Sequence, residues 1–106
     1  MGRFVIAGYK PRADQGPALR ALVKRHWPAL RDQALVSARP ALVMRADDGT
    51  IVEVFEWLSP QSVARAHDNP VVQALWAEFA AVCDFVPVGG LAEAARLFSE
   101  FESLAD

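Results

Sequence analysis

Apolar residues are densest along the chain between Ile51 and Leu58, where β-branched and aromatic residues predict a strand. Turn-forming residues bound this run, with Gly49 before it and Ser59-Pro60 after it. Alternation gives the strand two faces, one with Ile51, Glu53, Phe55 and Trp57 and the other with Val52, Val54, Glu56 and Leu58. Because both faces are mainly apolar, we expect both to be covered.

Each face of this strand also carries one carboxylate, Glu53 on the first and Glu56 on the second. Burying an ionised carboxylate is costly unless it is paired or hydrogen-bonded. Glu53 and Glu56 should therefore have partners, border a wet cavity or lie near a strand end. This is the first indication of a functional site.

Three further strands are predicted, at 3–10, 41–46 and about 85–88. The run Asp47-Asp48-Gly49 favours a hairpin between the second and third strands, because Gly supplies the positive φ that such turns require. These two strands should be antiparallel neighbours. Pro87 predicts an edge position or a strand end for the last strand.

Apolar residues at helical spacing lie between the strands. A first helix opens at Gly16-Pro17, and Pro28 should kink or divide it because proline removes a hydrogen bond. Two shorter helices follow the third strand and begin at Ser59-Pro60 and Asn69-Pro70. A last helix is predicted over 91–104, where apolar residues again recur at helical spacing.

The resulting order, βαββαβ with a C-terminal helix, predicts an α+β fold, a ferredoxin-like plait with a four-stranded antiparallel sheet. The length of 106 residues fits a single domain, 1–106, made of a core plait at 1–88 and a C-terminal helix extension at 89–106. Such a plait leaves one face of its sheet bare. Since the strands are apolar on both faces, we expect that face to pack against a second copy in a homodimer.

Composition and motifs limit the classes of partner, cofactor and cellular location that we expect. The formal net charge is −2 with both signs interspersed, so nothing favours nucleic acid. No apolar run reaches the ~20 residues that span a bilayer, and the N-terminus lacks a signal-peptide pattern. Cys83 is the only cysteine, which agrees with a reducing compartment, and we expect a cytoplasmic protein. No metal-ligand spacing or nucleotide-binding motif is present, so we expect no metal and no cofactor.

His67 follows Glu56 by eleven residues, so a strand-to-helix return would bring the two together. As a catalytic pair they would bind a ligand hydroxyl or move a proton. The alternative is that His67 braces the helix while Glu56 accepts its hydrogen bond.

A ligand pocket is predicted near this pair. Its candidate lining residues are Glu53, Phe55, Trp57, Trp76 and His26. The alternative is that these residues are core: His26 lies on the apolar stripe of the first helix, and aromatic residues at such spacing are core in most proteins.

The segment FEWLSPQSVARAH carries Glu56-Trp57 and then Ala66-His67, with Asn69-Pro70 opening the next segment. This pattern resembles the antibiotic biosynthesis monooxygenase-like group of dimeric α+β barrels. The resemblance implies a ferredoxin-like protomer, two of which close a barrel around apolar cavities. Members of that group include cofactor-independent oxygenases that act on activated polyphenols, haem-degrading enzymes and many domains of unknown role.

Two functions remain open. In the first, a homodimeric α+β barrel binds a small apolar or aromatic molecule beside Glu56 and His67. If it is an enzyme, its chemistry would be cofactor-independent and monooxygenase-like, with one of these two residues as the base. In the second, the protein is a non-catalytic dimerisation or ligand-sensing domain whose barrel is filled by its own side chains.

Overall fold

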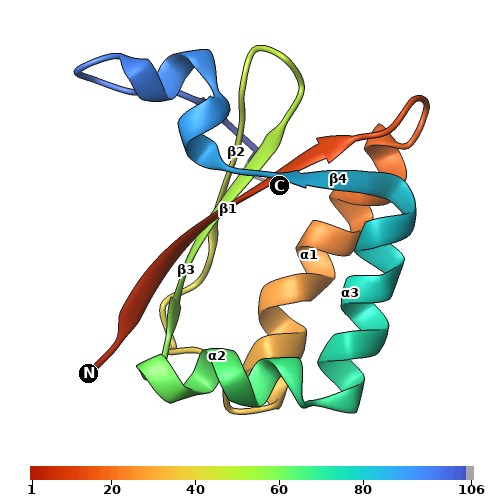
Figure 1. Cartoon of the computed structure of the whole chain (residues 1–106), viewed down its shortest axis with the longest axis vertical. Coiled ribbons are helices and arrows are strands. Elements are labelled where there is room, and N and C mark those ends of the chain that lie inside the picture. Colours follow the sequence, from red (N-terminus) through yellow and green to blue (C-terminus); the bar gives the residue numbers. More distant parts are fainter. Residues whose placement is uncertain (105–106) are drawn as a thin grey trace.

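A five-stranded antiparallel sheet with helices on one side forms the fold of residues 1–104, the part of the chain that the computed structural model describes (Figure 1). The strands are β1 (Arg3–Pro11), β2 (Leu42–Arg45), β3 (Ile51–Trp57), β4 (Cys83–Val86) and β5 (Glu102–Ser103), in the spatial order β4-β1-β3-β2-β5. The helices are α1 (Gly16–Asp32), α2 (Pro60–His67) and α3 (Pro70–Val82). The predicted α+β class is confirmed, whereas the predicted number of four strands is wrong because the C-terminal segment adds β5.

The strand predicted at 51–58 lies at the centre of the sheet as β3. It pairs antiparallel with β1 on one side, where Ile6 faces Val54, and with β2 on the other, where Leu42 faces Val54. The hairpin between β2 and β3 is confirmed: Gly49 has a φ of +93° and Thr50 N donates to Asp48 Oδ1 at 2.8 Å. Register and turn thus agree with the sequence pattern.

The helices cover one face of this sheet. Figure 1 shows α1 and α3 side by side against the strands, with α2 crossing one end. Asn69 caps α3 as expected, because its Oδ1 accepts from Val71 N at 2.9 Å and Val72 N at 3.2 Å. Pro28 was predicted to kink or divide the first helix, and the division does not occur: α1 runs through Pro28, because buried residues on both sides of the proline, including Leu30, hold it against the sheet.

The C-terminal segment crosses the opposite face of the sheet. The helix predicted over 91–104 is wrong: short 3₁₀ turns at Val88–Gly90 and Ala92–Ala95 lead into irregular chain and then β5. Leu91 packs with Ala46 and Val52 on this face, while Leu104 reaches the cluster on the helix side. A single helix cannot make both contacts and also pair with the edge of β2. Ala105 and Asp106, which end the predicted extension, lie outside the described residues.

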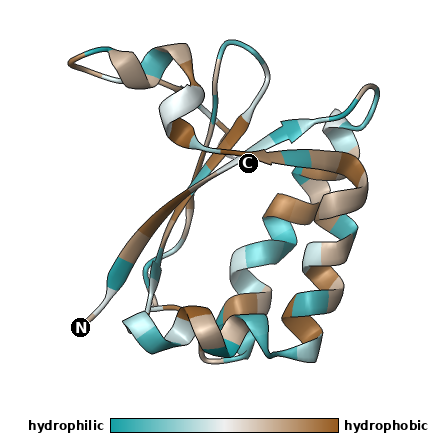
Figure 2. Cartoon of the chain, viewed as in Figure 1, coloured by the Kyte–Doolittle hydropathy of each residue, from teal (hydrophilic) through white to brown (hydrophobic). Residues whose placement is uncertain are grey.

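The C-terminal segment covers only part of this face. In Figure 2 the middle of β1 and β3 is coloured hydrophobic, and the segment crosses one end of these strands. Beyond it, Phe4, Ile6 and Leu42 remain 61%, 52% and 64% exposed, on the side away from the helices. We expected both faces of β3 to be covered. The helix side is covered, but only the half of the far face under the C-terminal segment is. We call the uncovered residues Phe4, Ile6, Leu42 and Val54 the bare patch.

Candidate functional site

Glu53 is the most deeply buried charged side chain among residues 1–104, with no exposed surface. Its Oε1 accepts a hydrogen bond from the Tyr9 hydroxyl at 2.8 Å and lies 2.7 Å from Nδ1 of His26. Its Oε2 is buried and has no hydrogen-bond partner among these residues. A carboxylate in this environment needs its partners to offset the loss of water.

The protonation of His26 follows from its two neighbours. Trp76 Nε1 lies 2.9 Å from His26 Nε2, and an indole N–H can only donate. His26 Nε2 is therefore the acceptor, and the proton of the neutral imidazole is on Nδ1, which donates to Glu53. The result is a hydrogen-bonded chain of four side chains, Tyr9, Glu53, His26 and Trp76, which we call the polar chain.

Four elements position the polar chain, for reasons that the sequence contains. Glu53 and Tyr9 point to the helix side because they alternate in phase with the buried residues of β3 and β1, which pair antiparallel. His26 faces them from α1, where it lies on the stripe of buried residues that includes Leu22 and Leu30. Trp76 is on α3, which packs beside α1.

A cavity of about 300 Å³ adjoins the polar chain between the sheet and the helices. Its lining residues are Val5, Ala7, Tyr9, His26, Phe55, Trp57, Trp76, Phe79 and Phe85. Phe85 is 56% exposed, so the cavity reaches the surface beside it. An apolar cavity with a few fixed polar groups is the usual form of a small-molecule site.

The predicted pocket residues meet at this cavity. Phe55, Trp57, Trp76 and His26 line it, and Glu53 lies directly behind His26. The alternative interpretation of His26 also describes it correctly, because this residue is buried and hydrogen-bonded within the core. That these residues bind a ligand stays a prediction.

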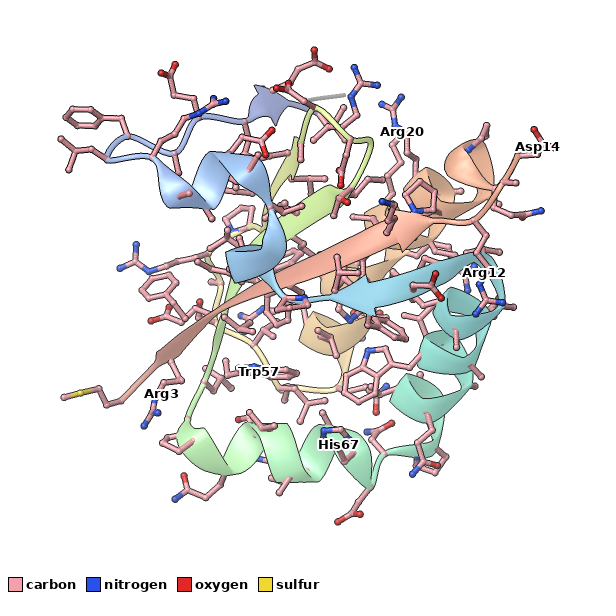
Figure 3. The ribbon with its side chains drawn as sticks, turned by 45° about the horizontal axis from the view of Figure 1, so that its top comes forward. Arg3, Arg12, Asp14, Arg20, Trp57 and His67 are labelled. Atoms are coloured by element: carbon pink, nitrogen blue, oxygen red, sulfur yellow. The ribbon has the colours of Figure 1, made fainter. Side chains whose placement is uncertain are left out.

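Glu56 and His67, predicted as a catalytic pair, are not brought together. Glu56 is on the far face of β3, where Arg39 Nε lies 3.2 Å from its carboxylate. His67 is on the helix side, exposed, with its ring 5.0 Å from that of Trp76 between centroids. Figure 3 shows Trp57, on β3, above α2, the helix that carries His67. The pair fails because Glu56 points to the face of β3 opposite the helices, whereas His67 lies on the helix side.

Two buried groups, Tyr9 in the cavity lining and Cys83 outside it, have a raised pKa. Burial first, and then the charge of Glu53, raise the pKa of Tyr9 far above its usual value, so its hydroxyl stays protonated. Burial also raises the pKa of Cys83, whose Sγ donates to Phe79 O at 3.1 Å. Neither group is a nucleophile, and Tyr9 serves as a hydrogen-bond donor.

Sequence reasoning missed Tyr9 and Phe85 as residues of this site. A signal was present for Tyr9: apart from Arg3 at the start of the strand, it is the one polar side chain on its face of β1, which pairs with the face of β3 that carries Glu53. A buried carboxylate needs donors, and Tyr9 and His26 are the donors that these apolar faces offer.

Other features of the described chain offer less for a site. A larger groove of about 550 Å³ lies between α1 and β2, and its described lining residues include no histidine and no carboxylate. Among residues 1–104 no three His, Cys, Asp or Glu side chains are grouped to hold a metal ion, and no helix has the length and apolar character to cross a membrane.

Comparisons of this chain with protein-family models, curated proteins and solved structures found no significant match.

Proposed function

We propose that this protein is a homodimer that binds a small, mostly apolar or aromatic molecule in the cavity between its sheet and its helices. The observation that carries the proposal is one cavity of about 300 Å³ in which aromatic walls surround a histidine fixed by a buried carboxylate. The volume is at the lower end of that of small-ligand sites. An open cavity on the helix side of the sheet also favours a ligand-binding protein over a non-catalytic dimerisation domain.

The proposed architecture is a ferredoxin-like protomer of a dimeric α+β barrel that works in the cytoplasm. The strand order β4-β1-β3-β2 and the helices on a single face support the protomer. The bare patch supports the dimer, since Ile6, Val54 and Leu42 form one apolar row across three strands. The single, buried Cys83 is compatible with a reducing compartment.

A cavity-filling variant tests ligand binding. Ala7 lines the cavity, so Ala7→Phe places a ring inside it, while Ala41→Phe adds the same ring in the groove between α1 and β2. The measurement is the fluorescence of the tryptophans, two of which line the cavity, during titration with tert-butylbenzene. We expect saturable binding to the wild type and to Ala41→Phe, and a loss of at least about tenfold in affinity in Ala7→Phe.

Native mass spectrometry of gently purified protein gives an independent check. We expect a dimer, with extra mass if the natural ligand is retained. A monomer would contradict the dimer, and equal titration curves for the Ala7→Phe variant and the wild type would contradict the cavity as the binding site.

A second candidate function is catalysis at His26. The bond from Nδ1 to Glu53 orients the ring and leaves Nε2 as the basic nitrogen, as in other histidine bases held by a carboxylate. Trp76 Nε1–H donates to this nitrogen in the structure, so a substrate would have to displace the indole to reach it. Proton abstraction or cofactor-independent oxygenation would then use His26 as the base instead of Glu56 or His67. Turnover of a panel of polyphenols in air should fall at least about a hundredfold in His26→Gln and persist in His67→Ala; the reverse result would exclude His26.

A further inference from the structure

The cavity beside His26 has a wall that favours positive charge. Six of its lining side chains, including Trp57 and Trp76, are aromatic, and the faces of aromatic rings carry negative potential. None of the lining side chains in the described part of the chain is Lys or Arg. A cation would therefore find favourable ring contacts and no like charge at close range.

Glu53 adds a negative charge behind this wall. Its Oε1 accepts hydrogen bonds from two neutral groups, the Tyr9 hydroxyl and His26 Nδ1–H, so neither cancels the charge. Its Oε2 has no hydrogen-bond partner among residues 1–104 although it is buried. A buried carboxylate that is only half satisfied is costly, and a cation nearby reduces that cost.

His26 separates this charge from the cavity by a single imidazole ring. One edge of the ring bonds to Glu53, and the ring itself lines the cavity. Because the surroundings are apolar and buried, the charge of Glu53 is poorly screened there. The second carboxylate of β3, Glu56, contributes little to this field, since it points to the far face and pairs with Arg39.

We infer that the cavity selects its ligand by charge: it takes an organic cation, a quaternary or protonated amine with apolar substituents, held by the aromatic wall and the field of Glu53. This inference rests on the proposed function, because it names the chemical class for the same cavity. The inference excludes ligands that would place a carboxylate, sulfonate or phosphate group in the cavity.

Three probes of nearly one shape separate charge from size. Phenyltrimethylammonium, tert-butylbenzene and benzenesulfonate share a phenyl ring and a compact tetrahedral head that is positive, neutral or negative. Titration of the wild-type protein, followed by tryptophan fluorescence, should give an affinity for the cation at least about tenfold above that for the anion.

The Glu53→Gln variant tests the source of the preference. Glutamine keeps an oxygen acceptor for Tyr9 and His26 and removes the charge. We expect cation affinity to fall about tenfold and tert-butylbenzene affinity to stay within about twofold. Glu56→Gln removes a carboxylate from the same strand on the far face, and should change none of the three affinities.

The outcomes separate the inference from the proposed function. Equal binding of cation and anion by the wild type overturns the inference and requires no variant to fold. Unchanged cation affinity in folded Glu53→Gln also overturns it. Binding of tert-butylbenzene alone overturns the inference and keeps the proposed function, whereas no binding of any probe overturns both.

Discussion

The two carboxylates of β3 lie three residues apart and in opposite environments. Glu53 is fully buried under α1, and its hydrogen bonds come from the neutral groups of Tyr9 and His26. Glu56, on the other face, is partly exposed and lies beside the guanidinium of Arg39. The strand and the residue type are the same, so the covering elements alone make the difference.

This contrast indicates that the two faces of the sheet have different functions. The helix face holds a carboxylate whose donors are fixed in place, next to a cavity, which is an arrangement suited to binding. The far face holds a solvent-screened ion pair beside the bare patch, which is suited to association with another protein surface. A carboxylate is therefore a site candidate only when its face and its partners are known.

The largest expected effect is the loss of the Glu53 side chain. Glu53→Ala leaves the Tyr9 hydroxyl and His26 Nδ1–H buried without an acceptor, which should lower the free energy of unfolding by about 3 kcal/mol. Glu56→Ala removes a screened pair and should cost less than about 1 kcal/mol. Urea denaturation of both variants measures the difference, and equal losses would contradict the contrast between the faces.

The next effect concerns the bare patch. Ile6 and Val71 are each 52% exposed, but Ile6 belongs to the bare patch and Val71 to the outer side of α3. Ile6→Asp places a charge in the proposed dimer interface and should weaken the dimer about a hundredfold, whereas Val71→Asp should leave it unchanged. Light scattering over a dilution series reports the mass. If the two variants have the same mass at every dilution, the bare patch is not part of the dimer interface.

The smallest effect is the pH dependence that Tyr9 adds. Its pKa is raised in the folded protein, while the unfolded chain ionises near a pH of about 10, so the unfolded state loses a proton first. The stability that Tyr9 contributes is present below that pH and falls above it by up to about 1.4 kcal/mol per pH unit.

Alkaline urea titrations of the wild type and Tyr9→Phe isolate this contribution, because the effect of the Cys83 thiol is common to both proteins. Tyr9 is the only tyrosine, so tyrosinate absorbance reports it alone and should appear only on unfolding. Tyrosinate absorbance near the normal pKa in the folded protein would show that the hydroxyl is not held by Glu53.

Local patterns predicted what local physics decides. The alternation of β3, the turn at Gly49 and the Asn69 cap all appear as expected, because each depends on neighbours in sequence. The helix prediction for 91–104 failed because apolar residues at helical spacing also fit a chain that places Leu91 on one side of the sheet and Leu104 on the other.

The site could be predicted only in part for a related reason. Alternation grouped Glu53, Phe55 and Trp57 correctly, but it could not tell which face the helices cover, since both faces of β3 are equally apolar. Glu56 and His67 were paired by closeness in sequence, whereas Glu53 meets Tyr9 and His26 across 44 and 27 residues. Such contacts are set by strand register and helix packing.

The two residues of β5 also protect the protein from aggregation through the edge of its sheet. Met44 pairs with Ser103, Arg45 pairs with Glu102, and Leu104 N donates to Val43 O at 3.0 Å, so backbone groups of β2 are occupied. An uncovered edge strand is a template for β-aggregation. A chain cut before Glu102 would expose the apolar β2 edge, and its copies would add strands to one another.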